Sequence, residues 1–131
     1  TIIKTSSGKE FEQIDGESIL SSAKKAGINF QYSCKTGRCS SCKCKLISGN
    51  TQTYSDEIGL TESEVKDGYI LSCIRYAEDN IEIEVDDLGD IEIPKAQVVP
   101  SKINTFKMLS EDVIQVILRI PPNINFNIIN G

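Results

Sequence analysis

Histidine and tryptophan are both absent from the 131-residue sequence. Without histidine the chain cannot build a metal centre that needs imidazole ligands, which excludes an iron–sulfur cluster held by two cysteines and two histidines. No apolar run reaches the length of about eighteen residues that a membrane span requires, and the start shows no signal-peptide pattern. No basic stripe with interleaved aromatic residues indicates nucleic-acid binding. We therefore expect a cytoplasmic protein with neither a membrane nor a nucleic acid as partner.

The composition is that of an ordinary soluble chain, with 39% apolar and 25% charged residues and a formal net charge of −5. The charge is unevenly distributed. Residues 1–93 hold ten Lys and Arg against seventeen Asp and Glu, whereas residues 94–131 hold four against two. A chain of this length builds one core of moderate size. We therefore expect one acidic domain followed by a separate segment.

Four of the five cysteines form the clearest pattern in the sequence. Cys34, Cys39 and Cys42 have the spacing C-x4-C-x2-C, and Cys73 follows alone. This is the ligand pattern of a plant-type 2Fe-2S cluster. Two irons bridged by two sulfides need four converging thiolates, so one curved loop supplies three and a distant segment supplies the fourth. The spacing predicts a 2Fe-2S cluster held by these four cysteines, and hence one-electron transfer.

The residues around the three-cysteine loop suit this interpretation. A loop that wraps a cluster must bring its backbone N–H groups close to the sulfurs, and Gly37, Ser40 and Ser41 are small enough to allow this. Gly37 can also adopt a positive φ without steric cost. Phe30 and Tyr32 precede the first cysteine, where we expect them to shield the cluster from water.

Cys44 is predicted not to be a ligand. The interval from Cys39 to Cys44 is also C-x4-C, but no cysteine follows Cys44 at the next required spacing. A small buried hydrophobic residue is the expected role for such a cysteine. A structural zinc site with four cysteines remains an alternative, although zinc sites usually pair their cysteines in two close knuckles. A disulfide scaffold favours a shorter chain with more cysteines.

The segments Ala26–Cys42 and Gly68–Cys73 resemble the cluster segments of plant-type ferredoxins. They are most similar to the ferredoxin domains at the N-terminus of NADH-dependent flavoprotein reductases. The resemblance implies an α+β fold of the β-grasp type, a mixed sheet with one main helix, over residues 1–93. It also implies that Cys34 and Cys39 hold the iron nearer the surface, and that Cys42 and Cys73 hold the inner one.

The same resemblance implies partners. Such reductases pass electrons from NADH through a flavin to oxygenases, to monooxygenases or to the dehydrase of 3,6-dideoxy-sugar synthesis, and the cluster and tail segments are most similar to the sugar-pathway type. We therefore expect a flavoprotein domain as donor and a redox protein as acceptor, with a free-standing ferredoxin as the alternative. Lys35 and Arg38 lie in the cluster loop, where they either contact an acidic partner or simply face solvent.

Local patterns predict most elements of the first 93 residues. Two short apolar runs around Ser6–Lys9 predict a hairpin over residues 1–14, and a helical apolar face follows up to Gly27. Thr61 and Glu64 form a capping box for a short helix, with Leu60 and Val65 as a hydrophobic staple. Further strands are expected over 43–47, 69–73 and 81–85. In the last of these, outward glutamates either dock a basic partner or blunt a sheet edge.

The C-terminal region is expected to differ in kind. Residues 94–102 read as a linker between domains. Residues 103–108 and 113–120 predict two strands that resemble the opening hairpin of a flavin-binding barrel. The sequence contains no flavin-binding motif and no glycine-rich nucleotide fingerprint, so FAD and NAD(P)H would bind to domains that are not present here. Two strands cannot close a barrel, and we therefore expect this sequence to be an excerpt of a longer protein.

Overall fold

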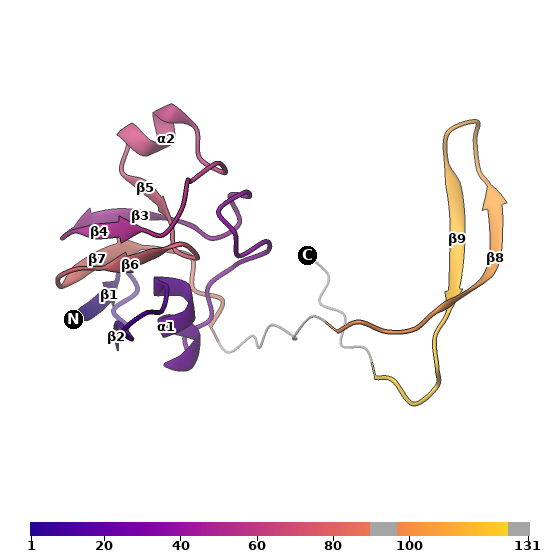
Figure 1. Cartoon of the computed structure of the whole chain (residues 1–131), viewed down its shortest axis with the longest axis horizontal. Coiled ribbons are helices and arrows are strands. Elements are labelled where there is room, and N and C mark those ends of the chain that lie inside the picture. Colours follow the sequence, from indigo (N-terminus) through magenta and orange to yellow (C-terminus); the bar gives the residue numbers. More distant parts are fainter. Residues whose placement is uncertain (90–96, 126–131) are drawn as a thin grey trace. The chain divides into compact units, whose positions relative to one another are not determined.

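The computed structural model describes residues 1–89 and 97–125 (Figure 1). The chain divides into two compact units, Thr1–Glu92 and Ile93–Gly131. None of the helices in the described residues is long and apolar enough to cross a membrane.

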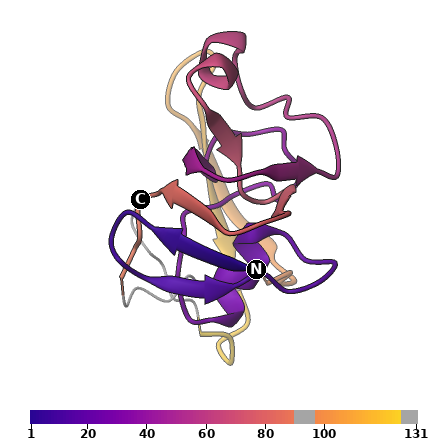
Figure 2. The same cartoon turned by 90° about the vertical axis from the view of Figure 1, so that its left-hand side faces the viewer.

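A five-stranded sheet forms the centre of the first unit (Figure 2). Its strands are paired in the order β2-β1-β7-β3-β5, and only β1 and β7 run parallel, so the sheet is mixed. The mixed sheet with one main helix confirms the predicted α+β fold class. The strand bounds are Ile2–Thr5 (β1), Glu10–Glu12 (β2), Lys43–Ser48 (β3), Tyr69–Leu71 (β5) and Ile81–Glu84 (β7).

The main helix, α1 (Ile19–Lys25), begins and ends where its local sequence predicts. Ser18 is the N-cap, and its side chain accepts a hydrogen bond from the Ser21 N–H. Gly27 follows the last turn with a φ of 78°, and its N–H donates to the carbonyl of Lys24. The apolar residues of α1 are buried, so the helix covers one face of the sheet, as Figures 1 and 2 show.

Two short strands, β4 (Thr51–Thr53) and β6 (Arg75–Ala77), pair in a second small sheet that no local pattern indicates. Both are too short for an alternating apolar pattern, and their pairing depends on residues far apart in the chain. The other short element, α2 (Glu62–Lys66), confirms the predicted capping box: the Thr61 side chain accepts from the Glu64 N–H, and the Glu64 carboxylate accepts from the Thr61 N–H.

The position of β7 corrects one expectation. Its alternation is as predicted, since Ile81 and Ile83 are buried and Glu82 and Glu84 are exposed. However, β7 lies between β1 and β3 in the middle of the sheet, so its glutamates do not protect a sheet edge. Four acidic residues follow β7, at positions 86, 87, 90 and 92, and positions 90 and 92 lie outside the described residues.

The second unit contains one antiparallel hairpin, β8 (Lys102–Met108) paired with β9 (Ile114–Arg119). The two predicted strands are confirmed, with β8 beginning at the last residue of the expected linker. Residues 94–96 of that linker lie outside the described residues, and residues 97–101 form neither helix nor strand. Every residue of β8 and β9 is exposed, including the apolar ones.

Candidate metal centre

The three-cysteine loop runs between α1 and β3, and its backbone is tightly curved. Lys35 is the only residue other than glycine with a positive φ in the described part of the chain, at 58°, and Gly37 has a φ of 75°. The positive φ predicted for Gly37 is therefore confirmed. A Cβ at Gly37 would also lie 3.0 Å from the carbonyl oxygen of Asp56, so glycine is needed for both conformation and space.

Cys34 and Cys39 are the outer two of the four predicted ligands, because both side chains are partly exposed. The backbone N–H and the hydroxyl of Thr36, and then Cys39, lower the pKa of Cys34 to about 6. The distance from the Thr36 nitrogen to the Cys34 sulfur is 3.4 Å. Hydrogen bonds to the charged form favour ionisation, and metals bind the thiolate rather than the thiol. These contacts therefore favour the thiolate form of Cys34, the form that a metal binds.

Cys42 and Cys73 are the inner two of the predicted ligands, with exposed fractions of only 3% and 8%. Burial raises the pKa of Cys42 to about 12, and the adjacent Cys73 thiol adds to the rise. Cys42 lies immediately before β3 and Cys73 follows β5, the strand paired with β3. The sheet therefore brings together two cysteines that are far apart in sequence.

Hydrogen bonds of Ser72 hold the inner pair in place. Its N–H and its hydroxyl both donate to the carbonyl oxygen of Cys42, over 3.1 and 3.0 Å. The carbonyl of Ser72 accepts from the Leu20 N–H in α1, over 2.9 Å. Ser72 is fully buried, so these contacts do not compete with water. Sequence analysis missed this residue, since a serine beside a cysteine gives no signal of its own.

Cys44 lies within β3, with its side chain buried in the hydrophobic core. Burial raises the pKa of its thiol to about 12, and the nearby Cys42 contributes. Within residues 1–89 and 97–125, no three Cys, Asp or Glu side chains converge in an arrangement that suits a single metal ion. The thiol of Cys34 interacts with that of Cys39, and the thiol of Cys42 with that of Cys73, so the four cysteines outside β3 lie as two pairs. Each iron of a 2Fe-2S cluster takes two protein thiolates, so this donor set fits the cluster.

The aromatic residues before the loop have different surroundings. Phe30 is buried at 1% exposure and packs edge-on against Phe11. Tyr32 is partly exposed, and the ammonium groups of Lys24 and Lys35 lie 5.3 and 4.5 Å from its ring centroid. Lys35 therefore rests against Tyr32 beside the loop, a position compatible with either of its predicted roles.

A comparison with known families decides what this centre is. Residues 2–78, more than half of the chain, match the family described as the 2Fe-2S iron-sulfur cluster binding domain. The chain belongs to this family. The matched segment of this 2Fe-2S domain contains the curved loop and all four paired cysteines, so the family and the donor set agree on a two-iron cluster.

The relatives of this 2Fe-2S domain are longer proteins. The CDP-6-deoxy-L-threo-D-glycero-4-hexulose-3-dehydrase reductase of Yersinia pestis is 35% identical over 118 residues, which cover 89% of this chain and 36% of the relative. The xylene/toluene monooxygenase electron transfer component of Pseudomonas putida is 34% identical over 118 residues, covering 88% of this chain and 33% of the relative. The chain thus spans about a third of the length of these curated relatives.

A solved structure supports the same fold. The ferredoxin reductase in carbazole 1,9a-dioxygenase, in its FAD apo form, aligns with a TM-score of 0.64 and 27% sequence identity. The alignment covers 91% of this chain and 40% of the other.

Proposed function

We propose that this chain carries single electrons through a 2Fe-2S cluster held by Cys34, Cys39, Cys42 and Cys73. The observation that supports this most strongly is the assembly of the four thiols into an outer and an inner pair from two distant segments. When bound, such a cluster supplies one-electron redox chemistry at a low potential, about −400 mV for plant-type ferredoxins.

The two pairs of cysteines differ in their exposure to solvent, and therefore in the role that we assign to each. Cys42 and Cys73 are buried in the hydrophobic core, which also contains Phe30 and which keeps water away from them. Cys34 and Cys39 are partly exposed, so electrons enter and leave most readily at this side. The Thr36 N–H lies within reach of the Cys34 sulfur and stabilises negative charge there.

The donor and acceptor are proposed from the relatives. Their names describe a dehydrase reductase and a monooxygenase electron transfer component. We infer that a flavin reduced by NAD(P)H, on a domain outside this chain, supplies the electrons, and that an oxygenase or a sugar dehydrase accepts them. A reducing, cytoplasmic location suits four free thiols that must bind iron.

The domain organisation follows the same proposal. Residues 1–93 form the 2Fe-2S domain, residues 94–102 the linker, and residues 103–131 the beginning of a flavin-binding barrel. Two observations support this division: the separate compact units, and the exposed apolar side chains of β8 and β9. A hairpin of this kind is marginally stable alone and gains stability when further strands cover it.

A serine series tests the proposal. Protein purified without oxygen is expected to be red-brown, to contain two irons per chain, and to give a one-electron paramagnetic resonance signal after dithionite reduction. Cys34→Ser, Cys39→Ser, Cys42→Ser and Cys73→Ser should each lose or strongly destabilise the cluster. Cys44→Ser is the matched control and should retain it, because Cys44 lies in the core.

Three results would contradict the proposal. A colourless protein that contains zinc would identify a structural zinc site, and loss of the cluster in Cys44→Ser alone would mean that the ligand set is wrong. NADH-dependent reduction of an external acceptor by this chain, without added flavoprotein, would contradict the assignment of flavin and NAD(P)H to other domains.

A further inference from the structure

The short segment Asp56–Gly59 lies directly against the three-cysteine loop. The Gly59 N–H donates to the carbonyl oxygen of Gly37 over 2.8 Å. A Cβ added to Gly59 would lie 2.4 Å from the carbonyl oxygen of Cys39, and a Cβ added to Gly37 would lie 3.0 Å from the carbonyl oxygen of Asp56. Backbone therefore packs on backbone here, which fixes the segment relative to the loop.

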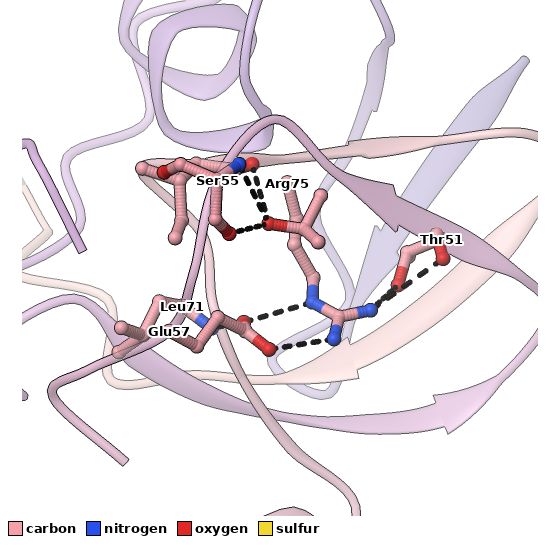
Figure 3. A network of polar contacts seen from close by, with 7 residues as sticks. Thr51, Ser55, Glu57, Leu71 and Arg75 are labelled. Atoms are coloured by element: carbon pink, nitrogen blue, oxygen red, sulfur yellow. Dashed lines mark hydrogen bonds and ion pairs between the residues drawn. The ribbon is translucent and has the colours of Figure 1, made fainter.

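Glu57, within this segment, reaches the part of the chain that carries Cys73 (Figure 3). Its Oε1 accepts hydrogen bonds from the Leu71 N–H over 2.9 Å and from Nε of Arg75 over 2.8 Å. Its Oε2 accepts from Nη2 of Arg75 over 2.6 Å. Leu71 and Arg75 lie two positions before and two positions after Cys73. One carboxylate therefore binds the chain on both sides of that cysteine.

The Glu57–Arg75 pair is well buried and has many partners. The exposed fractions of the two side chains are 10% and 20%, and Nη1 of Arg75 also donates to Oγ1 of Thr51 over 2.9 Å. Burial by itself would raise the pKa of Glu57, but the hydrogen bonds from Arg75 and Leu71 outweigh it, so this pKa lies below its usual value. A bidentate arginine–carboxylate pair has strict geometry, and it defines position as well as charge.

We propose that Glu57 is a positioning residue for the cluster: its carboxylate fixes Cys73 relative to the three-cysteine loop by holding Leu71 and Arg75. This deepens the proposed function and rests on Cys73 being a ligand. The geometry of the cluster explains why a positioning residue is needed. The cluster requires thiolates from two segments at set positions, and Asp56–Gly59 is in contact with both. A residue that only filled space would not join them through directional bonds.

The experiment compares loss of the cluster with loss of the fold, in the full chain loaded with its cluster. Glu57→Gln keeps an oxygen for the Leu71 N–H but removes the charge that orients Arg75. The control is a substitution of the fully buried Ile3 in β1, either Ile3→Val or Ile3→Ala, chosen to match the fall in Tm. Visible absorbance under an iron chelator reports the cluster, and far-ultraviolet circular dichroism reports the fold.

We expect Glu57→Gln to lose its cluster about tenfold faster than the wild type, or more, which is the scale of a lost charge-assisted hydrogen bond. The Ile3 control should lose it at close to the wild-type rate. The reduction potential adds a signature that a merely structural role does not produce. Glu57→Gln leaves Arg75 uncompensated and should raise the potential, whereas Arg75→Gln leaves Glu57 uncompensated and should lower it.

Each outcome has a defined meaning. Equal rates of cluster loss in Glu57→Gln and the matched Ile3 variant, or a reduction potential that Glu57→Gln leaves unchanged, would overturn the positioning role alone. Full retention of the cluster by Cys73→Ser would overturn the ligand assignment, and the positioning role with it.

Discussion

Strands β7 and β9 both have apolar residues at alternate positions, but these residues have opposite environments. In β7, Ile81 and Ile83 are 3% and 0% exposed. In β9, Val116 and Leu118 also occupy alternate positions, yet they are 49% and 54% exposed. The difference lies in the rest of the chain: β7 is an inner strand of a sheet covered by α1, whereas β9 is paired only with β8 in the described residues. Alternation specifies a strand, and burial requires a second layer.

The contrast extends to function. In the first unit the residues around the predicted cluster site are buried. The side chains of the inner cysteines, Ser72 and Phe30 are all less than a tenth exposed. The second unit presents large apolar side chains over both strands. The hydrophobic core of the described residues lies in the first unit, whereas the apolar side chains of β8 and β9 are exposed. Four predictions test this difference.

The largest effect is expected from Gly59→Ala. Its Cβ would overlap the Cys39 backbone, so either the loop or the Asp56–Gly59 segment must move. We expect the purified protein to contain little or no iron. Gly27→Ala is the control: unlike Gly59, Gly27 has a positive φ, 78°, which is unfavourable for alanine, but no atom lies within 4 Å of the added Cβ. Iron per chain checks this, and an iron content that falls equally in both variants would show that general destabilisation of the fold, rather than contact with the loop, is responsible.

The second prediction compares two phenylalanines. Phe11 is 5% exposed and packs on Phe30 with ring centroids 6.0 Å apart, whereas Phe106 in β8 is 73% exposed. Phe11→Ala should lower the free energy of unfolding of the first unit by about 3–5 kcal/mol. Phe106→Ala should change it by less than about 0.5 kcal/mol. Denaturant unfolding followed by circular dichroism measures both, and comparable losses would mean that the hairpin contributes to the core.

The third prediction concerns pH. The Lys43 ammonium, and then the N–H and hydroxyl of Thr61, lower the pKa of Glu64 to about 2. Because the folded-state pKa lies below the unfolded one, the stabilisation is complete above about pH 4.5 and is lost as the pH falls toward 2. Glu64→Gln should therefore have a lower Tm than the wild type at pH 7, and the difference should shrink at pH 3. A constant difference between these two pH values would contradict the prediction.

The smallest effect is expected from removing the second unit. Every residue of the hydrophobic core among the described residues lies between Ile3 and Ile83. A chain that ends after residue 96 should therefore keep its iron content, and its Tm should stay within the error of the full chain. The measurement is a side-by-side comparison of iron per chain and thermal unfolding. A clear loss of either would show that residues 97–131 belong to the same cooperative unit.

Local sequence was sufficient wherever neighbouring residues define the structure. Ser18 and Gly27 define the ends of α1, and Thr61 with Glu64 forms a capping box, because these hydrogen bonds join residues only three positions apart. The cysteine spacing predicted the family for a similar reason, since the chemistry of the cluster requires three thiolates from one loop. The assignment of the individual ligands stays a prediction until the serine series is measured.

Only the tertiary structure decided which distant residues meet. The pairing of β4 with β6, the inner position of β7 and the contact of Gly59 with Cys39 leave no periodic trace in the sequence. The Glu57–Arg75 pair is the clearest case, since a glutamate and an arginine eighteen positions apart look like two ordinary surface charges. They become a positioning device only because β5 and the three-cysteine loop bring their segments together. Folding brings the two residues together, and no local pattern in the sequence predicts that they meet.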